Sequence, residues 1–202
     1  KERIFVYNVQ NNIGNDNIFT TPERNGVIKA LRDISQKAST SDILLIFFAG
    51  HGVMRGSDDS FTFLTSDASR TNLIGVSTKD LALWLNPEGP FHMKPNKTIL
   101  IYDACNSGQA AKDLFATLSR DDDETERLRQ ISDLGDKSGL FILAGSAPNQ
   151  SAYETPSIGN GLLTYSLLYT LKNNLNILDY DNLGSGYLNL QKWFLETEKE
   201  QN

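Results

Sequence analysis

Two short apolar runs in the sequence lead into segments that carry a reactive side chain. Residues 43–48 (ILLIFF) continue as AGHG, which contains His51, and residues 98–102 (TILIY) continue as DACNSG, which contains Cys105. The thiolate is the nucleophilic form of cysteine, but a free thiol is mostly protonated at neutral pH. An adjacent imidazole can take that proton and later deliver it to a leaving amine. The two segments therefore predict nucleophilic catalysis by Cys105 and His51.

The backbone around these residues suits the same chemistry. Gly50 and Gly52 flank His51, and glycines let the chain approach a substrate closely. The N–H groups of Gly52 and Cys105 are candidates for holding a developing oxyanion. Gly108 lies at the expected start of a helix, and a helix N-terminus favours a nearby thiolate.

A parallel sheet would bring the two reactive residues together. The runs at 43–48, 98–102 and 140–144 (LFILA) are rich in branched and aromatic residues and lack polar alternation. Such runs are typical of strands that are buried on both faces of a parallel sheet. Ligands of open α/β sheets bind beyond the carboxyl ends of the strands. His51 and Cys105 both follow such an end, so we expect them at the same edge of the sheet.

Helical patterns alternate with these strands. Thr21 and Pro22 resemble the capped start of a helix over 22–37, and Ser77 with its following residues resembles a capped start before 81–85. The remaining elements expected are a strand at 3–9 and helices at 108–118, 161–172 and 188–198. This alternation predicts one α/β domain over residues 1–202, with a mostly parallel sheet and helices on both faces.

Composition restricts the setting and the partners. The hydrophobic fraction of 39% and the charged fraction of 22% are those of an ordinary soluble globular protein. The net charge is −6 and the local charge run at 121–124 is acidic, which disfavours nucleic-acid binding. No apolar run approaches the ~20 residues of a membrane span. Cys105 is the only cysteine, so an internal disulfide is excluded and a reducing, cytoplasmic compartment is expected.

The segments FAGHG at 48–52 and DACNSG at 103–108 resemble the two catalytic motifs of caspase-like peptidases, which comprise caspases, metacaspases, paracaspases and their prokaryotic relatives. His51 precedes Cys105 by 54 positions, close to the ~50-residue spacing of caspases. The resemblance extends from the first expected strand to the last helix. It implies a caspase-like three-layer sandwich, membership of the prokaryotic branch, and cysteine endopeptidase activity that requires no cofactor. It also implies an oxyanion site at the backbone of Gly52 and Cys105.

Two residues depart from the caspase pattern. In metacaspases and paracaspases an acid two positions before the nucleophile binds arginine or lysine at P1, and Asp103 stands at that position. The segment 146–154, which begins with Ser146, is similar to a caspase loop that forms a wall of the cleft, and it brings Glu154 where caspases present an arginine. Because carboxylates pair with guanidinium groups, cleavage after Arg or Lys is expected. The alternatives are a structural acid at Asp103 and a solvated residue at Glu154.

The polar stretch 119–138 is expected to be a flexible loop, part of which, 124–131, could form a short helix. It resembles the cleavable linker of caspase-like enzymes. Arg120, Arg127 and Arg129 lie in it, so self-cleavage there is consistent with a basic P1 residue. Some metacaspases bind calcium through acidic residues, which makes Asp121–Glu124 a candidate calcium site. A solvated acidic loop is the simpler interpretation.

The resemblance also implies an element that the sequence lacks. The family's sheet normally begins with a strand upstream of the one expected at 3–9, followed by residues that help to form the S1 pocket. A sheet without this central strand exposes unpaired backbone groups. We therefore expect an N-terminal segment or regulatory partner that completes the sheet, in addition to a protein or peptide substrate. Nucleic acid and membrane are not expected partners.

Other interpretations remain open. An inactive caspase-like interaction module would not need to keep both His51 and Cys105. Separase-like peptidases share the His-Gly and Cys motifs, but the DAC sequence at 103–105 favours the caspase-like branch. A nucleotide-binding protein is disfavoured because no glycine-rich phosphate loop has the usual spacing. His92, in a proline-flanked loop, is the only other candidate base. The leading interpretation is regulated proteolysis in defence or cell-death signalling.

Overall fold

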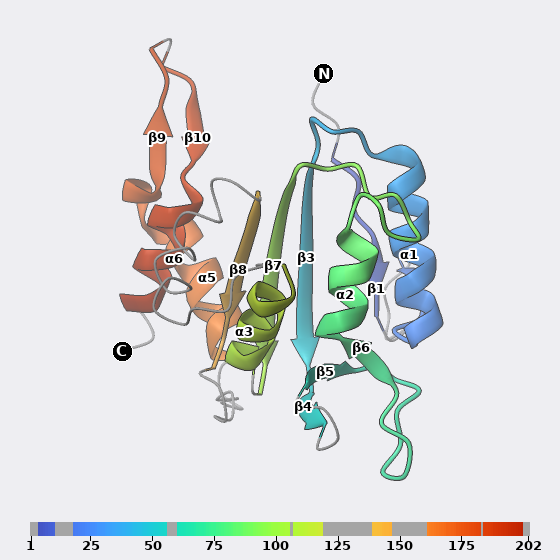
Figure 1. Ribbon diagram of the computed structural model, residues 1–202. Helices are drawn as coiled ribbons and strands as arrows, with labels where there is room; N and C mark the ends of the chain where they lie inside the picture. The colour runs from blue at the N-terminus through green and yellow to red at the C-terminus, as the bar shows by residue number, and fades with distance from the viewer. Residues whose placement is uncertain are drawn as a thin grey trace.

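The computed structural model describes residues 4–10, 18–55, 60–105, 107–118, 139–146, 161–182 and 184–199. The centre of this part of the chain is a sheet of three parallel strands (Figure 1). The strands, in order across the sheet, are β3 (Ile43–Gly50), β7 (Lys97–Ala104) and β8 (Leu140–Ala144). Each contains one of the three apolar runs. The predicted α/β class and the parallel strands are therefore confirmed.

Three helices lie in front of the sheet in Figure 1, namely α1 (Arg24–Lys37), α2 (Thr78–Leu85) and α3 (Ser107–Leu118). Even-numbered residues of β3 and β7 point into the core on this side. Among them, the rings of Phe48 and Tyr102 stack with their centroids 5.0 Å apart. Side-chain packing therefore reinforces the hydrogen-bonded pairing of β3 with β7.

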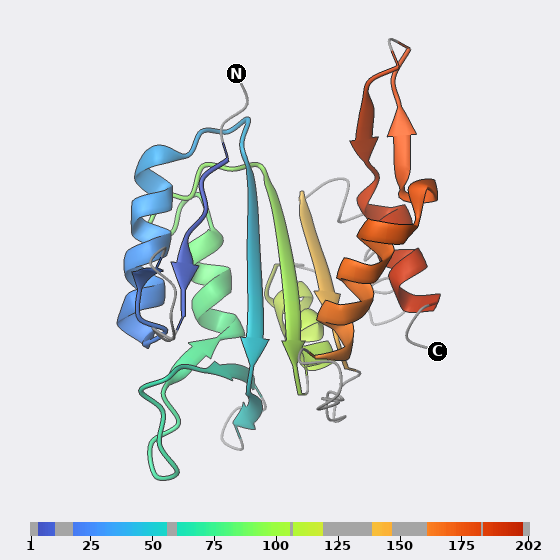
Figure 2. The ribbon, with the colours of Figure 1, turned by 180° about the vertical axis from the view of Figure 1, so that it is seen from behind.

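The opposite face of the sheet carries α5 (Leu162–Asn173) and α6 (Leu190–Lys199), and a 3₁₀ turn at Leu175–Ile177 follows α5 (Figure 2). A second core forms here from Ile99, Ile101, Leu163, Leu167, Ile177 and Trp193. The indole Nε1 of Trp193 donates a hydrogen bond of 3.2 Å to the carbonyl of Leu167, which ties α6 to α5. Ile99 and Ile101 of β7 are thus buried beneath α5.

The rear face of β3 departs from the prediction that all three strands are buried on both faces. Leu44 and Phe48 point forward and are buried, whereas Ile43, Leu45 and Phe47 point to the rear and are exposed. The reason is visible in Figure 2, where the described helices of the rear face do not extend across β3. β7, by contrast, is buried along nearly its whole length.

A small antiparallel ribbon follows the carboxyl end of β3 and was not predicted. It consists of β4 (Gly52–Arg55), β5 (Ser60–Leu64) and β6 (Gly75–Ser77). A second antiparallel pair, β9 (Leu178–Tyr180) and β10 (Gly186–Leu188), projects between α5 and α6. These strands are too short for periodicity to separate them from loops.

The N-terminal strand is shorter than the prediction of residues 3–9. Only Asn8–Val9 form β1, which pairs in parallel with β2 (Ile18–Thr20). Residues 4–7 belong to no ladder among the described residues. Their apolar pattern is that of a strand, but the ladders of the described ranges do not include them.

The two helix starts predicted from capping signals have different outcomes. The start of α2 is confirmed, because the Ser77 hydroxyl and the Asp80 carboxylate form a capping box. α1 begins at Arg24, with Glu23 rather than Thr21 at the N-cap position. Its first N–H is instead accepted by the Asp67 carboxylate at 3.3 Å, a partner too distant in sequence for a local pattern to reveal.

The expected flexible loop at 119–138, with its helix at 124–131, lies outside the described residues. None of the helices in the described ranges has the length and apolar character that crossing a membrane requires.

The Tyr102 hydroxyl generates a prediction about stability. This side chain is buried, its hydroxyl has no hydrogen-bond partner among the described residues, and burial raises its pKa far above the usual range. A buried hydroxyl without a partner costs about 1–3 kcal/mol. Tyr102→Phe should therefore raise the free energy of unfolding, by about 1 kcal/mol, in urea titrations. Tyr165→Phe, at an exposed tyrosine, should leave it unchanged. A loss of stability in Tyr102→Phe would show that the hydroxyl has a partner.

Candidate active site

The register between β3 and β7 places the two reactive residues at the same level of the sheet. Ala49 pairs with Asp103 and Gly50 with Ala104, so His51 and Cys105 are the next residue on each strand. A Cβ atom on Gly52 would lie 2.4 Å from the carbonyl oxygen of Cys105. The two motif backbones are therefore in direct contact, at the edge of the sheet where both residues were expected, and the contact leaves no room for a side chain at position 52.

The turn that presents His51 depends on glycine. Gly50 has a φ of +153°, a conformation that residues with a side chain rarely adopt, and it ends β3 one residue before the histidine. The His51 carbonyl then accepts a 2.8 Å hydrogen bond from the Leu64 N–H, which fixes the entry into the ribbon. The His51 side chain is exposed at this edge. It is thus held at its backbone and open to an incoming substrate.

The Gly52 N–H is directed away from β5. Gly52 is paired with Phe63. The neighbouring pair, His51 with Leu64, is joined by the hydrogen bond from the Leu64 N–H to the His51 carbonyl. Along an antiparallel ladder, pairs of opposite residues that exchange hydrogen bonds alternate with pairs that do not. Gly52 and Phe63 therefore form a pair that exchanges no hydrogen bonds. This orientation is the one that a backbone oxyanion donor at Gly52 would need.

The cysteine loop is held by a reciprocal pair of serines. The Ser107 N–H donates to Ser146 Oγ and the Ser146 N–H donates to Ser107 Oγ, each at 3.1 Å. The Ser146 hydroxyl also reaches the carbonyl of Ala104 at 3.2 Å. Ser107 is fully buried and begins α3 two residues after Cys105. Ser146, expected in the substrate cleft, therefore positions the loop that contains Cys105; its contact with substrate stays a prediction.

Asp113 connects the cysteine-bearing segment to the histidine-bearing segment. It lies on α3, which follows Cys105, and its carboxylate accepts the Phe61 N–H of β5 at 2.8 Å. The same carboxylate accepts the Thr78 hydroxyl at 3.2 Å. Because β5 pairs with the strand that follows His51, this carboxylate links the supports of both motifs.

Asp103 points to the rear face and contacts the start of α5. Its side chain is buried and accepts hydrogen bonds from both the N–H (3.1 Å) and the hydroxyl of Thr164, at the same oxygen, Oδ2. A Cβ on Gly161 would lie 2.3 Å from Oδ2 and 2.4 Å from Oδ1. The first N–H groups of a helix have no acceptor within the helix, and the Asp103 carboxylate supplies one for Thr164. Asp103 therefore makes a structural contact with α5, and its role in binding the substrate stays a prediction.

The structure separates His92 from the site. His92 is exposed in the loop before β7, whereas Cys105 follows the other end of that strand. Eight strand residues span roughly 25 Å, so His92 cannot serve as the base for this cysteine. His51 is the histidine at the correct edge.

Several predicted residues lie outside the described ranges: Glu154, Arg120, Arg127, Arg129 and the acidic run Asp121–Glu124. In the ranges that are described, no group of three or more potential metal ligands comes together. Sequence reasoning gave no role to Ser107, Asp113, Gly161 or Thr164. Ser107 and Gly161 lie close to predicted features, but Asp113 has no signal, because its partners are far away in sequence.

Comparison with known proteins agrees with this geometry. A family model described as a caspase domain matches residues 6–185. The fold is similar to the crystal structure of protein GSU0716 from Geobacter sulfurreducens, with a TM-score of 0.53 and 17% identity, over 91% of this chain and 73% of that one. At such identity the likeness supports the fold alone. No protein in the curated set matches the chain.

The role of Asp113 is testable by truncation. Asp113→Ala removes the acceptor of the Phe61 N–H and the Thr78 hydroxyl, and should lower the free energy of unfolding by about 1–3 kcal/mol in urea titrations. Peptidase activity measured well below the melting temperature should also fall, because the histidine and cysteine segments lose their link. The matched control is Lys112→Ala, at an exposed position of the same helix, which should alter neither quantity. Equal behaviour of the two variants would contradict the proposed link.

Proposed function

The chain belongs to the caspase-domain family of peptidases, and we propose that it is a cysteine endopeptidase with Cys105 as nucleophile and His51 as base. Membership supports cysteine peptidase activity in general, although the family also includes inactive members. The observation that carries the proposal is the contact between Gly52 and the Cys105 carbonyl, together with the strand register beside it. An inactive module would have no need for this arrangement of both reactive residues.

The proposed reaction has two steps. His51 takes the proton of the Cys105 thiol, and the thiolate attacks the carbonyl carbon of the scissile peptide bond. The oxyanion that forms is held by the N–H groups of Gly52 and Cys105. Collapse of this tetrahedral intermediate breaks the C–N bond of the peptide, and the amine leaves with the proton that His51 donates. Water, deprotonated by His51, then hydrolyses the thioester and restores the thiol.

We assign the P1 side chain a positive charge. Asp103 lies two residues before the nucleophile, at the carboxyl end of β7, and its carboxylate is buried. The two hydrogen bonds from Thr164 both reach Oδ2. A carboxylate has about four acceptor sites on its two oxygens, so contact with Thr164 is compatible with binding a guanidinium or ammonium group. Thr164 would then orient Asp103 toward the substrate.

The proposal extends to regulation. A basic P1 preference would permit self-cleavage at Arg120, Arg127 or Arg129, and would suit regulated proteolysis in defence or cell-death signalling. The proposed chemistry needs no cofactor, and Asp121–Glu124 is the candidate site for a regulatory calcium ion. A reducing, cytoplasmic setting would keep the single cysteine as a thiol.

A scan of fluorogenic peptides with Arg, Lys or Asp at P1 tests the function. We expect kcat/KM for Arg and Lys to exceed that for Asp by about 100-fold or more, the scale of a mismatched buried charge. Cys105→Ala and His51→Ala should each abolish turnover. Preference for Asp would contradict the specificity, and a folded protein that cleaves none of the peptides would indicate a non-catalytic module.

Gly161→Ala tests the S1 role of Asp103 without changing any charge. The added methyl group would overlap the Asp103 carboxylate, so this carboxylate or the start of α5 must move. We expect kcat/KM for the Arg peptide to fall at least 10-fold, mainly through KM. The rate of Cys105 alkylation by iodoacetamide should stay unchanged, because the dyad does not use Asp103. A parallel fall in both rates would show a general disturbance of the site.

A further inference from the structure

The two oxygens of the Asp103 carboxylate have different surroundings. Oδ2 accepts hydrogen bonds from both the N–H and the hydroxyl of Thr164. An ionised carboxylate has about two acceptor sites on each oxygen, so both sites of Oδ2 are in use. In the described part of the chain no hydrogen bond reaches Oδ1. Oδ1 is therefore the atom that stays open to a further donor.

Gly161 crowds the side of the carboxylate on which a two-pronged donor would bind. A Cβ atom on Gly161 would lie almost equally close to Oδ1 and Oδ2 of Asp103, and slightly farther from Cγ. One Cα hydrogen of Gly161 therefore points between the two oxygens. A guanidinium that binds in the bidentate mode needs this approach, because its two N–H groups must reach both oxygens at once. Two contacts from the start of α5 thus disfavour bidentate pairing.

The side of Asp103 that faces β3 is more open than the side that faces α5. Asp103 is paired with Ala49, so both side chains belong to the rear face of the sheet. Ala49 is exposed and carries only a methyl group, whereas Thr164 and Gly161 occupy the side of α5. A long, unbranched side chain can therefore approach the carboxylate over this methyl group.

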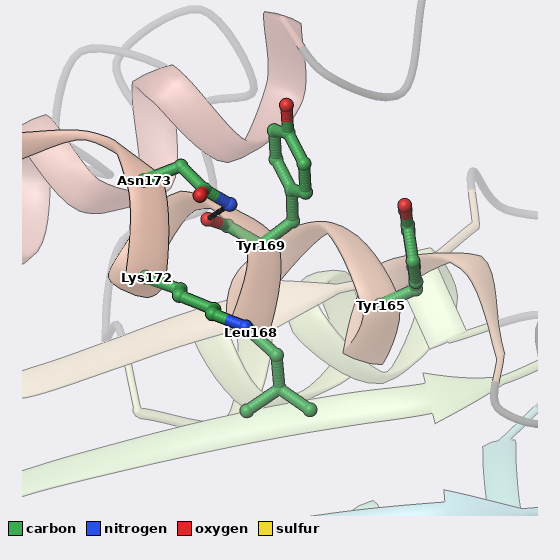
Figure 3. Close-up of a pocket in the computed structure, with 5 residues that line it drawn as sticks. All are labelled: Tyr165, Leu168, Tyr169, Lys172 and Asn173. Carbon is green, nitrogen blue, oxygen red and sulfur yellow. Dashed lines mark hydrogen bonds between the residues drawn. The ribbon is translucent and has the colours of Figure 1, made fainter.

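No cation of α5 neutralises this carboxylate. Figure 3 shows a pocket on the exposed flank of the helix, which is lined by Tyr165, Leu168, Tyr169, Lys172 and Asn173. Lys172 is the one basic residue of α5 and lies about 12 Å along the helix axis from Thr164. Within the described ranges Asp103 forms no ion pair. Its charge is thus left for a ligand.

We propose that Thr164 and Gly161 restrict Asp103 to a single contact with the P1 cation, at Oδ1, so that peptides are cleaved after Lys as efficiently as after Arg. This inference rests on the proposed role of Asp103 in binding P1. An ammonium group is a compact charge that one oxygen can satisfy, whereas a guanidinium group loses its second parallel hydrogen bond. Arg would therefore have no advantage, and Thr164 would be a positioning residue that acts through Asp103.

Thr164→Val tests this inference with two fluorogenic peptides that differ only in Arg or Lys at P1. In the unmutated protein, kcat/KM for the two peptides should agree within about 3-fold, because each cation makes one contact. Valine has the shape of threonine without the hydroxyl, so one site of Oδ2 becomes free and the carboxylate can turn away from Gly161. The ratio of kcat/KM for Arg to that for Lys should then rise at least about 5-fold. Thr164→Ser keeps the hydroxyl and is the matched control, which should retain the original ratio.

This ratio separates a role in P1 recognition from a purely structural one. If Thr164 only supported α5, Thr164→Val would lower both activities together and leave the ratio unchanged, which would overturn the proposal. An Arg preference above about 10-fold in the unmutated protein would also overturn it, and equal rates there support it, whether or not Thr164→Val folds. A folded protein that cleaves neither peptide would instead refute the proposed function, and this inference with it.

Discussion

The parallel pairing of β3 with β7 is the constraint on which the candidate site depends. Gly50 is opposite Ala104, and this register determines where the residues that follow each strand lie. A slip of one residue would move every side chain of β3 to the other face of the sheet. It would also separate His51 from Cys105. The stacked rings of Phe48 and Tyr102 oppose such a slip, because the slip would bring Phe48 out of the core.

Polar contacts hold the loops that the ladder cannot reach. Beyond the last paired residues, the chain is positioned by Asp113, by the reciprocal bonds of Ser107 with Ser146, and by Thr164 on Asp103. Each joins segments that are far apart in sequence, and each partner is partly or fully buried. Losing one acceptor in such a place leaves a donor without water or partner, which costs more than the bond itself contributes. A few hydrogen bonds therefore hold the loops, and the loss of any one of them would cost much stability.

Much of the framework was predictable, and the reasons are local. The solid apolar runs gave the three parallel strands, and Ser77 with Asp80 gave the start of α2, because each signal lies within a few residues. The site contacts of Asp113 were not predictable, since its partners lie 35 and 52 positions away. The exposure of Leu45 was mispredicted for a related reason. An apolar run shows what a strand can bury, and only the tertiary structure shows what covers it.

The two strands that lead to His51 and Cys105 have unequal support. β7 is buried on both faces, so Cys105 follows a strand that the core holds on every side. β3 has a partner strand along one edge and a core on one face, so His51 follows a strand with about half of that support. Local stability follows buried apolar contact and protected backbone bonds. The chain is therefore held less firmly on the side of His51, the candidate base, than on the side of Cys105, the candidate nucleophile.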